Sequence, residues 1–541
     1  MNEGINRPWH KFYTEKNKSV FKIPNLSLYQ MLEETVQKYP NSTAIIYEGE
    51  TVTYQTLKDK IDRLANAWKQ LGIKKSERIG LMLGNHPDYI ICYYAAQMLG
   101  ATVVQVNPKY TPRELLEIIN DAGIQFIVAS ATNCYLLREV EKEVQFQFVF
   151  LSNNDSVRQN NASLSSPTYS IDKLIHDFSL LENYEEINIT EDIAVIQYTG
   201  GTTGKVKGAM LTHYNLLANV VQSYSMYNER LEDGKETTLL ATPLYHVYAM
   251  TAGMNLSIFS GHTLLVVSTF DVDKVLLLIK KYRPTFFPGV PTMYNAFVNH
   301  PHVHKYGLDS FKVCSSGSAP LPPDILHRFE KTSGVSILEG FGMSETSPTS
   351  HRSPINAPRK IGSVGIPVPL TDSKVVDNSG NEVEVGVTGE LIIKGPQVMK
   401  GYWNKPRETK EVLHNGWLYT GDLATMDRDG YFYIVGRKKE MIISGGFNIY
   451  PQEVEGVLYD HPAVKEAAVI GIPHKYSGEQ VKAFVVLKEG KTITEEELLN
   501  HCYKHLTRYK VPKQFEVRKS LPRNTVGKLL KRVLIEEERN K

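Results

Sequence analysis

Hydrophobic residues recur every three or four positions in the stretch 57–71, which predicts an amphipathic helix. The apolar positions are Leu57, Ile61, Leu64, Trp68 and Leu71. Gly72 follows and predicts the end of this helix, because glycine readily adopts the left-handed conformation found there. An earlier helix is predicted from the cap residue Ser27 to about Tyr39.

Short apolar runs then alternate with helical patterns along the first 290 residues. We predict a hairpin over 44–54, strands at 78–83, 102–106, 124–129, 193–198, 238–242, 263–267 and 285–288, and helices after Pro87 and over 112–122. This alternation predicts an α/β fold with a largely parallel sheet. The polar stretch 152–168 is predicted to be a loop of low order.

The pattern changes further along the chain. Residues 375–394 and 431–435 are typical of short antiparallel strands, which predicts a smaller β-rich lobe beside the α/β part. Residues 438–541 hold nineteen basic and fourteen acidic residues and have their own pattern, with strands at 464–470 and 481–488 and a helix at 495–505. We therefore expect an N-terminal domain, 1–437, and a small α+β C-terminal domain, 438–541.

Composition narrows the class of protein. A chain of 541 residues exceeds what one hydrophobic core usually supports, and 42% hydrophobic with 22% charged residues is ordinary for a globular protein. A net charge of +2 argues against nucleic acid as the main partner. The four cysteines are widely separated, which suits buried thiols in a reducing compartment, so a cytoplasmic location is expected.

Membrane association is expected to be peripheral at most. The N-terminus has no apolar core of a secretory signal, and the most apolar run, 89–106, is interrupted by Gln97, Gly100 and Gln105. We interpret that run as a buried helix followed by a strand. The basic leader that carries Trp9 could touch an anionic membrane surface, although the sequence favours a solvated tail.

The stretch Tyr198–Gly208, YTGGTTGKVKG, carries the strongest chemical signal. Glycines let an anion approach backbone N–H groups, threonines add hydroxyl donors, and lysines add positive charge. The candidate phosphate-binding residues are Thr199, Gly200, Gly201, Thr202, Thr203, Gly204 and Lys207. The spacing fits neither a P-loop nor a dinucleotide fingerprint, since Val206 follows the first lysine and Gly340-Phe341-Gly342 lacks a third glycine.

Seven segments in this order resemble the adenylate-forming acyl-CoA synthetase superfamily, with the bacterial long-chain fatty acid–CoA ligases as the most similar branch. They are Tyr198–Gly208, Pro243–His246 (PLYH), Ser316–Pro320 (SGSAP), Phe341–Glu345 (FGMSE), Tyr419–Asp422 (YTGD), Gly436–Glu440 (GRKKE) and Pro522–Lys528 (PRNTVGK). The resemblance covers nearly the whole chain. It implies a C-terminal domain that rotates about a hinge near Lys439.

The resemblance also implies the roles of individual residues. Glu345 and Thr202 would hold Mg²⁺, Asp422 would bind the ribose hydroxyls, and Lys528 would neutralise charge between the carboxylate and the α-phosphate. Further nucleotide and CoA contacts are expected at Gly317, Ser318, Ala319, Glu339, Gly340, Phe341, Gly342, Met343, Ser344, Arg437, Ser444, Gly445 and Gly446.

Two histidine features are less specific. His246 resembles an aromatic gate on the acid-binding tunnel, and a histidine satisfied within the core is the alternative. The triple His300, His302 and His304 resembles a metal-binding set by composition, but it lies in a proline-containing loop with no acidic neighbour in the sequence. We therefore do not expect a metal there.

The resemblance implies an acid–thiol ligase that uses ATP and Mg²⁺, forms an acyl-AMP intermediate and transfers a long-chain fatty acyl group to CoA. Gly200, Val206 and Lys439 replace the family's usual Ser, Pro and Asp, and none of these changes removes a catalytic group. The alternatives are a ligase for a medium-chain or aryl acid, an adenylase that loads a carrier protein, and a nucleotide sensor without turnover.

Overall fold

The computed structural model describes residues 7–15, 22–152, 164–181, 183–200, 206–523 and 527–541. Its internal contacts form two compact units, Met1–Asp372 with Lys394–Gly416, and Ser373–Ile393 with Trp417–Lys541. This grouping differs from the predicted division after residue 437, because the β-rich lobe groups with the C-terminal residues. The predicted mobile boundary and its hinge stay predictions. Most of the predicted loop 152–168 lies outside the described residues.

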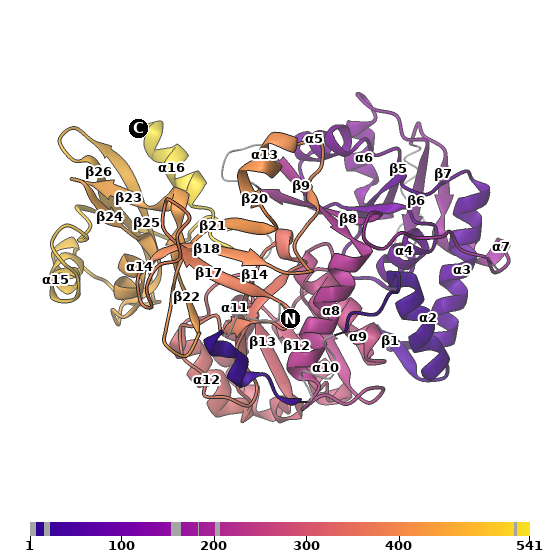
Figure 1. Cartoon of the computed structure of the whole chain (residues 1–541), viewed down its shortest axis with the longest axis horizontal. Helices are drawn as coiled ribbons and strands as arrows, with labels where there is room; N and C mark the ends of the chain where they lie inside the picture. Colours follow the sequence, from indigo (N-terminus) through magenta and orange to yellow (C-terminus); the bar gives the residue numbers. More distant parts are fainter. Residues whose placement is uncertain (1–6, 16–21, 153–163, 182, 201–205, 524–526) are drawn as a thin grey trace. The chain divides into compact units, whose positions relative to one another are not determined.

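The first unit contains two mixed sheets with helices packed on them (Figure 1). In the described part of the chain, one sheet has the order β16 (Ile366–Pro367), β15 (Thr349–Arg352), β14 (Ile337–Gly342), β13 (Val313–Ser316), β12 (Phe286–Gly289), β10 (Thr237–Leu240), β11 (Thr263–Val266), β1 (Thr43–Tyr47) and β2 (Glu50–Thr53). The strands from β14 to β1 are parallel, and the outer pairs are antiparallel.

The other sheet of the first unit has the order β19 (Gly401–Tyr402), β9 (Val206–Thr212), β8 (Ile193–Gly200), β4 (Thr102–Gln105), β3 (Arg78–Met82), β5 (Phe126–Ser130), β6 (Phe148–Ser152) and β7 (Thr168–Ser170). In this order, each strand from β8 through β4, β3, β5 and β6 to β7 is parallel to its neighbour. Strands β8 and β9 form an antiparallel hairpin. This hairpin encloses residues 201–205 of the predicted phosphate loop, which lie outside the described residues.

The four predicted N-terminal helices are confirmed as α2 (Leu28–Lys38), α3 (Tyr54–Gln70), α4 (Pro87–Met98) and α5 (Pro112–Ala122). Ser27 and Thr111 form capping boxes at the N-terminal ends of α2 and α5. These boxes give hydrogen-bond acceptors to backbone N–H groups that have no partner within the helix. The other helices are α6 (Cys134–Val140), α7 (Ile171–Asp177), α8 (His213–Tyr227), the π-helix η4 (Tyr248–Asn255), α9 (Leu256–Phe259), α10 (Val272–Tyr282), α11 (Pro291–Asn299), α12 (Pro323–Ser333) and α13 (Pro406–Val412). No helix in the described ranges is long and apolar enough to cross a membrane.

The predicted solvated leader is wrong for residues 7–15. The short helix η1 (Pro8–Phe12) packs on the first unit, and Trp9 is fully buried. Arg7 pairs with Asp372 at 2.9 Å, and the Tyr13 hydroxyl donates to the carbonyl of Pro367 at 2.7 Å. The indole that suggested membrane contact is therefore part of the core.

The second unit has a β-rich lobe and a C-terminal sheet. The lobe pairs β18 (Gly389–Lys394) and β22 (Phe432–Arg437) with β21 (Trp417–Met426), and β17 (Asp372–Val376) lies beside β18. The C-terminal sheet has the order β24 (Phe447–Ile449), β23 (Ile442–Ser444), β26 (Gly478–Leu487) and β25 (Val464–His474), with β27 (Gln514–Arg518) parallel to β26. Helices α14 (Pro451–Tyr459), α15 (Glu495–His505) and α16 (Lys531–Arg539) complete it.

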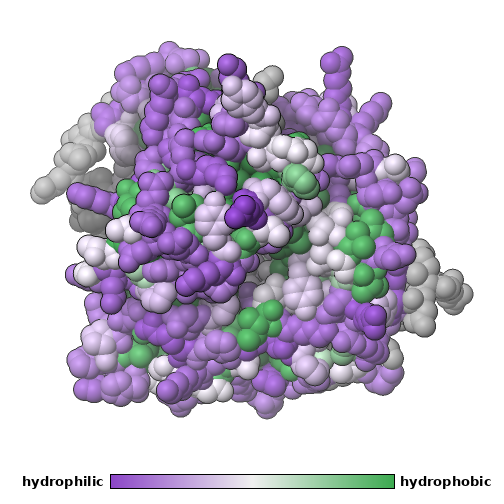
Figure 2. All heavy atoms as spheres, turned by 90° about the vertical axis from the view of Figure 1, so that its left-hand side faces the viewer, coloured by the Kyte–Doolittle hydropathy of each residue, from purple (hydrophilic) through white to green (hydrophobic). Residues whose placement is uncertain are grey.

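The antiparallel ladder of β25 and β26 forms the centre of the C-terminal sheet. Its buried side chains pack with those of α14 and α15 on one hydrophobic cluster and with Leu534 of α16 on another. The face of the molecule in Figure 2 is mainly hydrophilic, with hydrophobic residues in small separate groups. Some apolar side chains of this unit are nevertheless exposed, among them Ile443, Phe447 and Tyr476.

Candidate active site

The β8–β9 hairpin fixes both ends of the phosphate loop. Thr199 pairs with Lys207 across the hairpin, and the Thr199 hydroxyl donates to the Lys207 carbonyl at 3.3 Å. Gly200 pairs with Val206 in the next register position. Gly201, Thr202, Thr203 and Gly204 lie outside the described residues, so their roles stay predictions.

Lys207, Tyr402 and Glu345 lie together in the first unit. The Tyr402 hydroxyl donates to Oε1 of Glu345 at 2.7 Å, and the Lys207 ammonium lies 5.1 Å from the centre of the Tyr402 ring. Glu345 is buried, in the short helix η7 (Ser344–Thr346) that follows β14. A buried carboxylate oxygen suits Mg²⁺, and a lysine beside it suits a phosphate. Tyr402 was missed because no local motif marks it.

The turn from β14 into η7 requires glycine for a steric reason. A Cβ atom on Gly342 would lie 2.0 Å from the carbonyl oxygen of Pro348, and one on Gly340 would lie 3.0 Å from that of His351. The Met343 N–H donates to the same Pro348 carbonyl at 3.0 Å. Phe341 and Ser344 complete the turn, so this predicted nucleotide-binding segment has a tightly determined backbone.

Glu339 lies at the start of the same segment, and the pKa of its carboxyl group is unusual. Burial raises the pKa of Glu339 to about 7, even though a backbone N–H bond from Leu321 and the charge of Arg359 oppose the shift. The carboxyl group is therefore partly protonated near neutral pH. Sequence reasoning placed Glu339 among the nucleotide-binding residues but contained no signal for this protonation.

The Gly317–Ala319 turn follows β13 and packs on an aromatic ring. A Cβ atom on Gly317 would lie 3.2 Å from the ring of Tyr248, and Ser318 has a left-handed φ of 71°. Tyr248 begins the π-helix η4 and shares a 3.0 Å hydrogen bond with the Ser315 hydroxyl. The turn is thus held against the start of this helix, a helix type that occurs often at functional sites.

His246 lies just before η4, with its ring centre 4.7 Å from that of Tyr245. Burial lowers the pKa of His246 to about 4, so the imidazole is neutral at pH 7. A neutral imidazole fits both the predicted gate and the alternative of a core histidine, and the gate stays a prediction.

The second unit positions Asp422 with Arg437. The two residues pair across β21 and β22, and Arg437 Nε lies 2.8 Å from Asp422 Oδ1. The Asp422 side chain is buried, and its backbone N–H donates to the Thr420 hydroxyl at 3.0 Å. A carboxylate fixed in this way can accept hydrogen bonds from vicinal hydroxyl groups, as a ribose site requires.

Ser444, Gly445 and Gly446 form the turn between β23 and β24, where both glycines have left-handed φ angles, 56° and 83°. Phe447 follows, is 54% exposed and stacks on Tyr509 at 4.5 Å between ring centres. Two glycines at these angles keep the turn free of side chains, which would allow a narrow ligand to approach the backbone.

Lys528 also belongs to the second unit, directly after Gly527, which has a φ of 80°. Residues 504–523 form a basic run with seven Lys and Arg side chains, which could meet the phosphates of CoA or form a solvated face. Several of these groups are already paired, since Lys510 binds Glu453 at 2.6 Å and Arg518 binds Glu537 at 2.6 Å. The run therefore offers fewer available charges than its composition suggests.

The His300 cluster needs one correction. His300 Nε2 lies 3.0 Å from Asp273 Oδ1, so the histidines have an acidic neighbour that the linear sequence hides. Even so, the residues that the structure describes contain no group of three or more His, Cys, Asp or Glu side chains arranged to hold a metal ion. A hydrogen-bonded contact with Asp273 holds His300 in its position.

Lys207 at the start of β9, the Tyr402 ring and the buried carboxylate of Glu345 form a cluster in the α/β unit, an arrangement that suits a nucleotide-binding enzyme. The chain belongs to the AMP-binding enzyme family, whose model matches residues 32–403, and the model of the family's C-terminal domain matches residues 453–528. The resemblance read from the seven segments is confirmed.

Curated relatives match along nearly the full length. A long-chain-fatty-acid–CoA ligase of Bacillus subtilis (strain 168) is 40% identical over 556 residues, covering 98% of each chain. A protein of the same name from Escherichia coli O157:H7 is 39% identical over 95% of each chain. Among solved structures, ATP-bound MatB from Rhodopseudomonas palustris is 30% identical with a TM-score of 0.85, covering 94% of this chain and 98% of that one. The predicted fold class is confirmed.

Proposed function

We propose that the protein is an ATP-dependent acid–thiol ligase that converts a long-chain fatty acid and CoA into acyl-CoA, AMP and pyrophosphate. The observation that carries this proposal is the Lys207–Tyr402–Glu345 cluster, in a chain of the AMP-binding enzyme family. The near full-length similarity to long-chain-fatty-acid–CoA ligases supports the choice of acid.

In the first half-reaction, a carboxylate oxygen of the acid attacks the α-phosphorus of ATP, and the bond from that phosphorus to the β-bridging oxygen breaks. Pyrophosphate leaves and acyl-AMP forms. Two anions approach each other, so charge neutralisation is the main task of the protein. We assign Lys207 and the loop to the leaving pyrophosphate and Lys528 to the α-phosphate.

The donor set of the first unit fits a bound Mg²⁺. Glu345 offers a buried carboxylate that accepts a hydrogen bond from the neutral hydroxyl of Tyr402. Thr202 is the second predicted ligand of the ion. When bound, Mg²⁺ supplies further neutralisation of the phosphate charge. Tyr402 holds the carboxylate of Glu345 in place, which keeps the ligand oriented.

In the second half-reaction, the CoA sulfur attacks the acyl carbonyl carbon, and the bond from that carbon to the AMP oxygen breaks. The thiol proton passes to solvent, and AMP leaves. We propose that rotation about Lys439 presents Ser444, Gly445 and Gly446 to the pantetheine arm. The side-chain-free turn at these glycines supports this role.

Location is a further part of the proposal. Four free cysteines, three of them buried, agree with a reducing cytoplasm. The tryptophan-bearing leader does not support peripheral membrane contact, because Trp9 is buried.

The test is a pair of coupled assays on the full chain. Pyrophosphate release with fatty acid and ATP, followed by CoA consumption with AMP formation, would support the ligase. Pyrophosphate exchange without acyl-CoA would favour carrier loading, and ATP binding without either product would favour a sensor. A panel of acids from C6 to C18 with benzoate and coumarate decides the acid class. Equal or better turnover of the aryl acids would overturn the long-chain assignment.

A further inference from the structure

The segment that carries Lys528 is closed at its base. The Leu530 N–H donates to the Pro522 carbonyl at 2.8 Å, and Arg523 and Leu529 form an antiparallel bridge. Lys528 therefore lies directly before the bridged residue Leu529. The contacts that hold this bridge act on the backbone next to Lys528.

Arg523 holds the base from one side. Its Nη1 donates to the carbonyl of Gly527 at 2.6 Å, directly before Lys528. Its Nε and Nη2 donate to Oε2 of Glu466 on β25, at 3.2 Å and 2.7 Å. The planar guanidinium thus joins the peptide group that precedes Lys528 to a central strand of the sheet.

Lys531 holds the other side, three residues after Lys528 and at the start of α16. Its Nζ lies 2.7 Å from Oε1 of Glu455 on α14 and 3.4 Å from Oε2 of Glu440. Burial opposes the charge of Lys531, but the two carboxylates outweigh it and hold the pKa of Lys531 above its ordinary value. Glu440 is next to Lys439, the predicted hinge.

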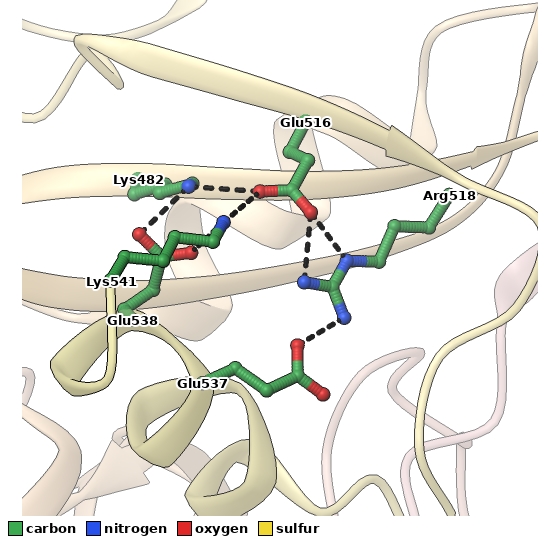
Figure 3. A network of polar contacts seen from close by, with 6 residues as sticks. All are labelled: Lys482, Glu516, Arg518, Glu537, Glu538 and Lys541. Atoms are coloured by element: carbon green, nitrogen blue, oxygen red, sulfur yellow. Dashed lines mark hydrogen bonds and ion pairs between the residues drawn. The ribbon is translucent and has the colours of Figure 1, made fainter.

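Helix α16 is itself fixed to the sheet, as Figure 3 shows. Lys482 of β26, 7% exposed, lies 2.9 Å from Glu516 of β27 and 2.9 Å from Glu538 of α16. Arg518 of β27 pairs with Glu537 of α16 at 2.6 Å. Lys531 therefore extends from a helix whose C-terminal end is anchored to the sheet, so its contacts can determine where the Lys528 segment lies.

We propose that Arg523 and Lys531 are positioning residues for Lys528, and that Lys531 links this segment to the hinge through Glu440. The proposal rests on the proposed function, in which Lys528 acts in adenylation alone. Arg523 orients the peptide before Lys528, and Lys531 fixes the residues after it. Weakening either contact lowers adenylation and spares thioester formation, because the second step uses a different face of the unit.

Arg523→Gln and Glu466→Gln test the first contact. Each should lower the kcat of fatty-acid-dependent pyrophosphate release about 10–100-fold, since small displacements of a catalytic group cost up to about that much. The KM for ATP and the rate of thioester formation from supplied acyl-AMP should stay within about 2-fold of wild type. Arg523→Lys should recover part of the loss, and the double variant should be no worse than the worse single variant.

Arg532→Gln is the matched control, because it also replaces an arginine near Lys528 but Arg532 makes only an exposed pair, with Glu536 at 3.4 Å. It should leave both steps unchanged. Equal losses in both steps, or a raised KM for CoA alone, would overturn the proposal and favour a structural or CoA-phosphate role for Arg523. Wild type that forms no acyl-CoA would refute the proposed function instead.

Glu440→Gln tests the link to the hinge with little risk to folding, because Glu440 makes the longer of the two contacts of Lys531. Adenylation should fall about 3–10-fold with the thioester step unchanged, a smaller loss than for Arg523→Gln because one contact remains. An unchanged adenylation rate would remove the hinge link and leave Lys531 with Glu455 alone.

Discussion

Replacing Glu339 by Gln should stabilise the protein, and the gain should grow with pH. The carboxyl group of Glu339 has a pKa of about 7 in the folded chain, against 4.5 for an ordinary glutamate. For an acid whose folded pKa is raised, stability is fully present below the unfolded pKa and falls as pH rises towards the folded pKa. Glutamine has no charge to desolvate, and its oxygen can still accept the N–H of Leu321.

The size of the effect follows from the shift. At about 1.36 kcal/mol per pKa unit, wild type loses about 3 kcal/mol of stability between acid pH and pH 8. The advantage of Glu339→Gln in the free energy of unfolding should therefore be about 1 kcal/mol at pH 5 and about 3 kcal/mol at pH 8. Most of the change falls between pH 4.5 and pH 7.

Urea titrations of both chains at pH 5, 6, 7 and 8 measure this difference. Glu143→Gln, at an exposed glutamate on the same unit, is the control for the substitution itself. A constant difference for Glu339→Gln across the series would refute the reasoning, because it would mean that Glu339 titrates in the folded chain as it does in the unfolded one.

Three other variants test the described contacts. Tyr402→Phe removes a 2.7 Å bond to the buried carboxylate of Glu345 and should cost about 1.5–3 kcal/mol in urea unfolding, and no change would mean that water replaces the hydroxyl. Lys531→Met leaves Glu455 without its 2.7 Å ion-pair partner and should cost about 3–5 kcal/mol in the same assay, whereas a gain would show that burial outweighs pairing. Gly342→Ala forces a Cβ atom onto a backbone carbonyl and should lower the melting temperature and pyrophosphate exchange together, so normal exchange would contradict the steric argument.

The helices of the first unit could be predicted because their signals are local. The cap residues Ser27 and Thr111 act within three positions of themselves, and the apolar face of α3 needs only its own sequence. The seven motif segments were found for the same reason. Each segment can be recognised without knowing what it contacts.

The features that could not be predicted depend on partners far along the chain. Tyr402 meets Glu345, 57 residues away, and His300 meets Asp273, 27 residues away. The segment that carries the buried Trp9 is held by Asp372 and Pro367, more than 350 residues away. A one-dimensional pattern records that these residues are aromatic or charged, but only the fold decides what lies against them.

The N-terminal segment has a consequence for the synthesis of this protein. Arg7 and Tyr13 bind Asp372 and Pro367, which are made more than 350 residues later. At about 5–20 residues per second, a ribosome needs roughly 20–70 s to produce these partners. Until then the contacts of Arg7 and Tyr13 on either side of Trp9 cannot form. The first aromatic residues of the nascent chain therefore lack these contacts through most of translation. A chaperone that binds exposed apolar segments would meet them during that time.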